Sequence, residues 1–154
     1  MLTLRFIDSN VFLHAFLVPR RALTEDEQFV KDEAKKIVKR VEEGEEVVTS
    51  AVHLSEVVNI VESGLGLQKS LWFLAWIVMC GNIKVCPVSL RDFEAAFPLA
   101  RDNDVSVNDA LAYSLMISEG VREIYSFDKH FNNFEDVKRL PNLPTTIREK
   151  RTKA

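Results

Sequence analysis

Cysteine, glycine and proline are all scarce in this sequence. Of its 154 residues only Cys80 and Cys86 are cysteines, too few for a disulfide framework and without the paired spacing of a zinc site. Five glycines and five prolines are too few for a fibrous or disordered chain. Because 47% of the residues are hydrophobic and 28% are charged, we expect an ordinary globular protein with free thiols.

The sequence also lacks a secretion signal and a long hydrophobic run. Its first residues, MLTLRF, have neither the basic region nor the small-residue cleavage site of a signal peptide. The strongest apolar run, Leu71 to Cys80, is about half of the roughly 20 residues that a membrane-spanning helix needs. We therefore expect a cytoplasmic protein that does not enter a membrane.

No excess of positive charge is present, because 20 basic residues are outnumbered by 23 acidic ones. A general electrostatic attraction to nucleic acid or anionic lipid is thereby excluded, and a phosphate-bearing substrate must be bound in another way. The last ten residues hold four basic side chains and one acid. We predict one domain over residues 1–147, followed by a basic, solvated tail over residues 148–154.

Short apolar segments alternate with segments of helical periodicity along the chain. The apolar segments predict strands at Leu2–Ile7, Glu46–Ser50, Ile83–Val88 and Glu123–Phe127, and a weaker pattern predicts one near Thr145–Ile147. Parallel strands need a crossover, which is usually a helix. The alternation therefore predicts an α/β fold, a three-layer sandwich with a parallel sheet flanked by helices.

The helices carry recognisable start and stop signals. Thr24 and Glu27 form a capping-box pattern at the start of a helix that should end before Gly44. Ser106 should begin a helix over Val107–Glu119 that Gly120 ends. Helices are also expected after Ser50 to about Gly64, over Gln68–Gly81, and from Ser89 to about Ala100, where Pro98 should kink or shorten the helix.

Four acidic residues fall where one edge of such a sheet should lie. Asp8 and Asp128 each follow an apolar strand, whereas Glu56 and Asp109 lie early in helices that begin at the same edge. Four carboxylates held together repel one another unless a cation neutralises them. Oxygen ligands select Mg²⁺ or Mn²⁺ over zinc, and the three histidines show no metal-ligand spacing. These acids therefore predict a site for Mg²⁺ or Mn²⁺.

The ordered combination of these motifs resembles the PIN domain family, and in size the VapC-type toxins. The resemblance rests on Asp8-Ser9-Asn10, Glu56, Asn108-Asp109-Ala110-Leu111, and the stretch Ser126 to Phe131. It implies a metal-dependent endoribonuclease that hydrolyses RNA, the toxin of a type II toxin–antitoxin pair with an antitoxin partner. The implied catalytic and metal-binding set is Asp8, Glu56, Asp109 and Asp128, with Asn10 and Ser126 in support.

Each acid alone also has a structural interpretation. Asp109 lies three residues after Ser106 and completes a capping-box pattern, and Asp128 can end its strand in an Asx turn. His130, beside Lys129, is interpreted as solvated or as a phosphate contact rather than as a catalytic group. Two alternatives therefore stay open: a PIN-type RNA-processing nuclease without an antitoxin, and a metal-free protein-interaction domain.

The apolar segment around Trp72, Phe73 and Trp76 predicts a protein interface. A helix that is hydrophobic on nearly every side exceeds what one small sheet can cover. Base stacking by these aromatics is the alternative, but packing against protein is more common in so apolar a run. We expect this helix to bind a second copy of the chain in a symmetric dimer, or an antitoxin helix.

Overall fold

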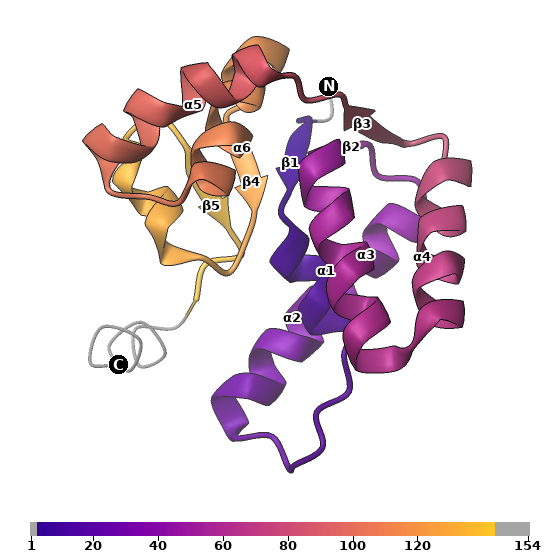
Figure 1. The fold of residues 1–154 in the computed structure, drawn as a ribbon. Helices are drawn as coiled ribbons and strands as arrows, with labels where there is room; N and C mark the ends of the chain where they lie inside the picture. The colour runs from indigo at the N-terminus through magenta and orange to yellow at the C-terminus, as the bar shows by residue number, and fades with distance from the viewer. Residues whose placement is uncertain (1–2, 144–154) are drawn as a thin grey trace.

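Five short parallel strands form one sheet at the centre of the molecule (Figure 1). The computed structural model describes residues 3–143. The sheet order is β3-β2-β1-β4-β5, and the strands are β1 (Arg5–Ile7), β2 (Val47–Ser50), β3 (Ile83–Cys86), β4 (Glu123–Tyr125) and β5 (Lys138–Leu140). The predicted parallel sheet is confirmed. The strand expected near Thr145–Ile147 lies outside the described residues.

Six α-helices cover the two faces of the sheet, as the α/β interpretation predicts (Figure 1). They are α1 (Ser9–Phe16), α2 (Glu25–Glu42), α3 (Ala51–Leu65), α4 (Leu67–Met79), α5 (Leu90–Asn103) and α6 (Val107–Glu119). Helices α1 to α4 pack on one face, α6 packs on the other, and α5 lies against α6. A short 3-10 helix, η1 (Lys129–Asn133), follows β4.

Successive side chains of the strands point alternately into two hydrophobic cores, one on each face of the sheet. Ile7 and Val47 point into the core formed with α1 to α4, whereas Phe6 and Val48 point into the core formed with α6. Successive side chains of a strand face opposite sides of the sheet, so each strand contributes to both cores. All four side chains are at most 1% exposed. The central strands are therefore buried on both faces and hold their carboxyl ends in fixed positions.

The local signals at the helix ends are largely confirmed. At the start of α2 the Glu27 amide donates to Thr24 Oγ1, and the Thr24 amide donates to Glu27 Oε1, each at 3.2 Å. The expectation that Pro98 shortens its helix was wrong, because α5 continues to Asn103. Pro98 cannot donate to the carbonyl of Glu94, but both residues are exposed, so water can satisfy that carbonyl.

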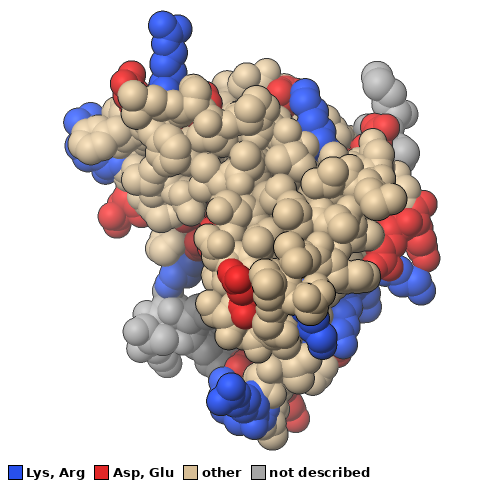
Figure 2. Space-filling model, turned by 45° about the vertical axis from the view of Figure 1, so that its right-hand side comes forward, with Lys and Arg blue, Asp and Glu red and all other residues tan. Residues whose placement is uncertain are grey.

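Helix α4 buries one side and leaves the other exposed. Phe73 and Ile77 enter the core, and the Trp76 ring packs against Phe12 and Phe16. Trp72 and Met79 are 61% and 84% exposed. Figure 2, which turns the α4 side of the molecule toward the viewer, shows few charged side chains on this surface. No helix among residues 3–143 has both the length and the hydropathy needed to cross a bilayer.

Candidate metal centre

The carboxyl ends of β1 and β4 bring the predicted acids to one edge of the sheet. Asp8 directly follows β1, and Asp128 follows β4 at the start of η1. Asp109 lies in the first turn of α6, the helix that leads into β4. The strand order reverses at β1, since β2 and β4 flank it on opposite sides. Such a reversal is where open α/β sheets bind ligands.

Asp8 is the most enclosed acid of this edge, with only 5% of its surface exposed. Its Oδ1 accepts from the Ser9 amide at 2.8 Å, and its Oδ2 accepts from the Ser126 hydroxyl at 2.7 Å. Burial, together with the nearby charges of Asp128 and Glu56, raises the pKa of Asp8 to about 6, although these two hydrogen bonds lower it. The ionised carboxylate is therefore costly here unless a cation compensates it.

Asp109 and Asp128 lie close to each other and to His130. One ligand atom from each of the three lies within 4.8 Å of the others. Burial, followed by the charges of Asp128 and Asp8, raises the pKa of Asp109 to about 7. Asp109 Oδ2 is buried and has no hydrogen-bond partner among residues 3–143. An unpaired buried carboxylate oxygen beside two other acids is the arrangement that a divalent cation stabilises.

The interpretation of Asp109 and Asp128 as structural residues is also partly correct. The Asp109 amide donates to Ser106 Oγ at 3.1 Å, so the serine cap of α6 is present, but no capping box through the Asp109 carboxylate is formed in the described part of the chain. Asp128 Oδ1 accepts from the His130 amide at 2.9 Å, which is the Asx turn that begins η1. Both main-chain contacts leave the Asp109 carboxylate directed into the cluster, so cap and site coexist.

His130, interpreted from the sequence as solvated or as a phosphate contact, is half exposed and also lies beside the acids. Its Nδ1 lies 2.9 Å from Asp128 Oδ1 and 4.0 Å from Asp109 Oδ2. The turn at Asp128 folds the histidine back over the acid that precedes it by two residues, a consequence of 3-10 geometry that sequence spacing does not reveal. The ring nitrogen of His130 lies among the carboxylate oxygens of the cluster.

Ser126 and Asn10, predicted to support the site, connect its parts. Ser126 Oγ donates to Asp8, accepts from the Asp128 amide at 3.0 Å, and lies 3.3 Å from Asn10 Nδ2. Asn10 Oδ1 also accepts from the Phe127 amide at 3.3 Å. One hydroxyl thus links the ends of β1 and β4, which fixes the distance between the two strands that carry Asp8 and Asp128.

Glu56 stands apart from the other three acids. It is partly exposed on α3, and its Oε2 accepts from Asn108 Nδ2 at 3.4 Å. Its charge still raises the pKa of Asp8, so the carboxylate faces the same space. The structure therefore brings Asp8, Asp109 and Asp128 together and places Glu56 beside them on α3.

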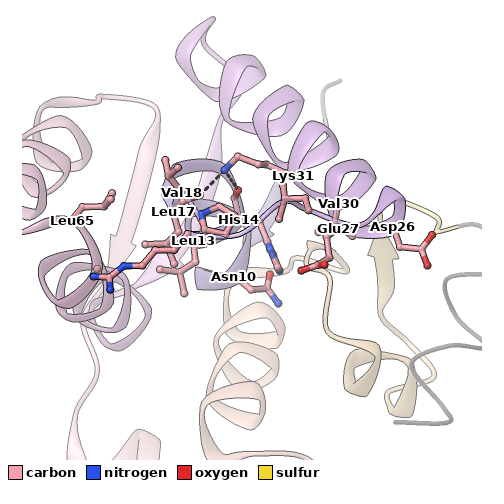
Figure 3. A pocket seen from close by; sticks show the side chains of 14 residues that line it. Asn10, Leu13, His14, Leu17, Val18, Asp26, Glu27, Val30, Lys31 and Leu65 are labelled. Atoms are coloured by element: carbon pink, nitrogen blue, oxygen red, sulfur yellow. Dashed lines mark hydrogen bonds between the residues drawn. The ribbon is translucent and has the colours of Figure 1, made fainter.

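A cavity of about 750 Å³ adjoins the cluster and shares Asn10 with it (Figure 3). Its walls come from α1, the start of α2 and the segment between them, and Gly64 and Leu65 close one side. Lys31 crosses the cavity wall to the end of α1, where its ammonium donates to the main-chain carbonyls of Leu17 at 2.6 Å and His14 at 3.1 Å. The apolar lining includes Leu13, Leu17 and Val30.

The sequence matches the family model of the PIN domain over residues 5–137. No curated protein matches the chain. The matched range begins at β1 and ends just before β5, so it includes every acid of the cluster.

Three solved structures with a similar fold come from toxins or toxin–antitoxin complexes. VapC20 of Mycobacterium tuberculosis, a sarcin-ricin loop cleaving toxin, is 20% identical with a TM-score of 0.65, covering 84% of this chain and 93% of its own. A toxin–antitoxin complex from Klebsiella pneumoniae gives 16% identity, a TM-score of 0.59, and coverage of 88% and 95%. VapBC2 from Rickettsia felis, bound to a promoter DNA fragment, is 11% identical with a TM-score of 0.60, and the match covers 90% of this chain and 98% of that one. At these identities the likeness shows the fold.

Proposed function

The chain belongs to the PIN domain family, and we propose that it is an endoribonuclease that hydrolyses RNA with Mg²⁺ or Mn²⁺. One observation carries the proposal: burial and the charges of neighbouring acids raise the pKa values of both Asp8 and Asp109. Strongly perturbed acids gathered at the strand-reversal edge of a sheet are typical of functional sites. A purely structural cluster would be more stable with neutral side chains.

In this proposal Asp8, Asp109 and Asp128 hold the ion, and Glu56 contributes from α3. A bound divalent cation lowers the pKa of a water molecule and stabilises charge on the scissile phosphate. Ser126 holds Asp8 by its hydroxyl and the Asp128 amide by its oxygen, so the carboxylates keep their spacing. Asn10 fixes the turn after β4 through the Phe127 amide. His130, which holds Asp128, lies where it can also contact a phosphate oxygen.

A cleavage assay with a matched control tests this proposal. Single-stranded RNA should be cut in Mg²⁺ or Mn²⁺ but not in EDTA, and Asp109→Asn should abolish the cutting. Asp102→Asn, a change of the same chemistry at an exposed residue of α5, should leave it intact. If calorimetry detects no binding of either ion to the wild-type protein, the metal-free interaction domain becomes the better interpretation.

We further propose that the chain is the toxin of a toxin–antitoxin pair. The related folds from Klebsiella pneumoniae and Rickettsia felis are toxin–antitoxin complexes. The cavity between α1 and α2 offers an antitoxin segment an apolar lining next to the cluster. Expression of the chain alone should arrest growth, and coexpression of a small protein encoded beside it should relieve the arrest. Growth that is unaffected by active enzyme would favour an RNA-processing nuclease.

The exposed side of α4 supports a second partner, another copy of this chain. Leu71, Trp72 and Met79 expose apolar surface along one helix. A symmetric dimer buries the same helix from both copies. Sedimentation should show a dimer for the wild type and a monomer for Trp72→Glu, whereas Lys69→Glu on the same helix should remain dimeric. A monomeric wild type at high concentration would contradict this assembly.

A further inference from the structure

His53 is a buried histidine that the acidic cluster described above does not include. It lies in the first turn of α3, directly under the cluster, and only 1% of its surface is exposed. Its ring meets the Phe6 ring edge to face, with centroids 5.2 Å apart and an angle of 78° between the planes. Phe6 precedes Asp8 by two residues on β1, so the ring is held in one orientation against the strand that carries the acid.

Contacts with Ser50 assign the tautomer of this histidine. Ser50 Oγ accepts from the His53 amide at 3.1 Å and lies 2.6 Å from His53 Nδ1. A hydroxyl has one proton to donate, and Ser50 is fully buried. If Ser50 donates that proton to Nδ1, then Ser50 Oγ, the His53 amide and His53 Nδ1 all have partners. The proton of the neutral imidazole then lies on Nε2.

The resulting Nε2–H faces Asp8. His53 Nε2 lies 3.8 Å from Asp8 Oδ1, and this buried nitrogen makes no hydrogen bond to any residue in the described range 3–143. With the ring neutral, the contact is that of an N–H dipole near a carboxylate, at a distance longer than a hydrogen bond. Burial keeps the ring neutral by lowering the pKa of His53 to about 4, against the effect of the Asn108 main-chain carbonyl close to the ring.

Asp8 therefore has two hydrogen-bond donors and the His53 ring beside it. The Ser9 amide and the Ser126 hydroxyl each take one carboxylate oxygen, and the Nε2–H approaches Oδ1 from α3. A carboxylate has about four lone-pair positions, so the two short hydrogen bonds leave Asp8 able to accept further contacts. The charge of Asp8 acts on Asp109, so the two carboxylates lie near each other. The ring also lies near Asn108, the residue before Asp109, and so joins the strand and the helix that present two of the acids.

We propose that His53 is a positioning residue whose Nε2–H orients the Asp8 carboxylate toward a divalent cation. The inference rests on the proposed function, since it concerns the same cluster. Partners that orient a metal ligand typically change metal affinity about 10- to 100-fold when removed. A histidine that only filled the core would contribute packing, and its removal would change stability without a specific effect on the ion.

Two substitutions separate these roles. His53→Leu keeps an apolar side chain of similar size and removes the donor, whereas His53→Gln keeps an N–H donor near the position of Nε2. Calorimetric titration with Mn²⁺ should show about 10-fold weaker binding for His53→Leu and a return to within about threefold of the wild type for His53→Gln. Val61→Ala, a core change farther along α3, controls for lost stability and should leave Mn²⁺ affinity unchanged.

A spectroscopic measurement tests the tautomer without any reaction. Long-range ¹H–¹⁵N spectra at neutral pH should show His53 protonated at Nε2, and addition of Mg²⁺ should shift that nitrogen. A spectrum with the proton on Nδ1, or equal Mn²⁺ affinity of His53→Leu and wild type, would overturn the role of His53 alone. A wild-type protein that binds no Mn²⁺ would instead overturn the metal centre itself.

Discussion

The acids at the two ends of the sheet have opposite electrostatic surroundings. At the amino end, Arg5 Nε donates to Glu123 Oε2 at 2.7 Å, and Arg5 Nη1 donates to the Tyr125 hydroxyl at 2.8 Å and to Glu45 Oε1 at 3.4 Å. At the carboxyl end, Asp8 and Asp109 are surrounded mainly by hydroxyls, amides and other carboxylates. The same strands thus end in a compensated cluster on one side and an uncompensated one on the other.

The pKa directions express this difference. Hydrogen bonds and charge from Glu123 and Tyr125 raise the pKa of the Arg5 guanidinium despite its partial burial. Burial and like charge raise the pKa of Asp8 to about 6 and of Asp109 to about 7. One cluster is stabilised by its charges and the other is destabilised by them. Uncompensated acids persist in folded proteins where function needs them, which is the lesson of the comparison.

The largest expected effect is on catalysis at the carboxyl end. Asp8→Asn should reduce metal-dependent RNA cleavage by about 10³-fold, because a ligand that stabilises transition-state charge is lost. Glu123→Gln, at the other end of the neighbouring strand, should cleave at the wild-type rate. The comparison requires both variants to be folded in the assay buffer, which circular dichroism checks. Equal rates for Asp8→Asn and the wild type would contradict the proposed site.

The second effect is a pH dependence of stability in EDTA. An acid whose pKa is higher in the folded than in the unfolded protein stabilises the fold at low pH, and that stability is lost as pH rises through the folded value. From the values for Asp8 and Asp109, the free energy of unfolding should fall between about pH 4 and pH 7 by on the order of 3 kcal/mol. Denaturant unfolding at several pH values measures this.

Two additions isolate the source of that dependence. Asp109→Asn cannot ionise, so its stability relative to the wild type should increase as pH rises. Saturating Mg²⁺ should restore the wild type at pH 8, because a ligand that binds only the folded state stabilises it. A wild type whose stability increases from pH 5 to pH 8 in EDTA would show that the acids are already compensated.

The third effect is expected at the amino end of the sheet, where removing a charge should lower stability, whereas removing the charge of Asp109 should raise it. Arg5→Met should lower the free energy of unfolding at pH 7 by about 2 kcal/mol, because Glu123 and Glu45 remain partly buried without their cation. Addition of Glu123→Gln should recover part of the loss. RNA cleavage should be unaffected at temperatures where the variant is folded. A stabilising Arg5→Met would remove the contrast between the two ends.

The smallest effect is expected for Glu56. It is partly exposed and bonded to Asn108, so Glu56→Gln in EDTA should change the free energy of unfolding by less than about 0.5 kcal/mol. Its effect on metal-dependent cleavage should nevertheless exceed that of Glu62→Gln, an exposed acid on the same helix. If the two variants cleave equally well, Glu56 is not part of the site.

Much of the fold was predictable because its signals are local. The capping pair Thr24 and Glu27 fixed the start of α2, and Gly120, with φ of 71°, ends α6 as expected. The positions of Asp8 and Asp128 after apolar strands predicted that they would meet at one edge. Their roles as metal ligands stay a prediction. The course of α5 past Pro98 was not predictable, because it depends on whether solvent reaches the Glu94 carbonyl.

The two histidines show where sequence reasoning ended. His130 enters the cluster through a 3-10 turn, and His53 faces Asp8 because α3 packs against β1. The position of His53 depends on how separate elements dock, which spacing along the chain does not show. The position of His130 depends on the conformation of the turn after Asp128. A capping serine three residues before a buried histidine, as with Ser50, was the one available signal for His53.

The pairing of β1 with β4 determines when the site forms during synthesis. Asp8 and Ser126 are joined by a hydrogen bond between residues 118 positions apart. Asp8, Glu56 and Asp109 are synthesised before Ser126 and Asp128, so until β4 exists the nascent chain lacks the residues that complete the cluster. Pairings of such separation form late in folding. The proposed nuclease activity therefore cannot appear until nearly the whole domain has been translated.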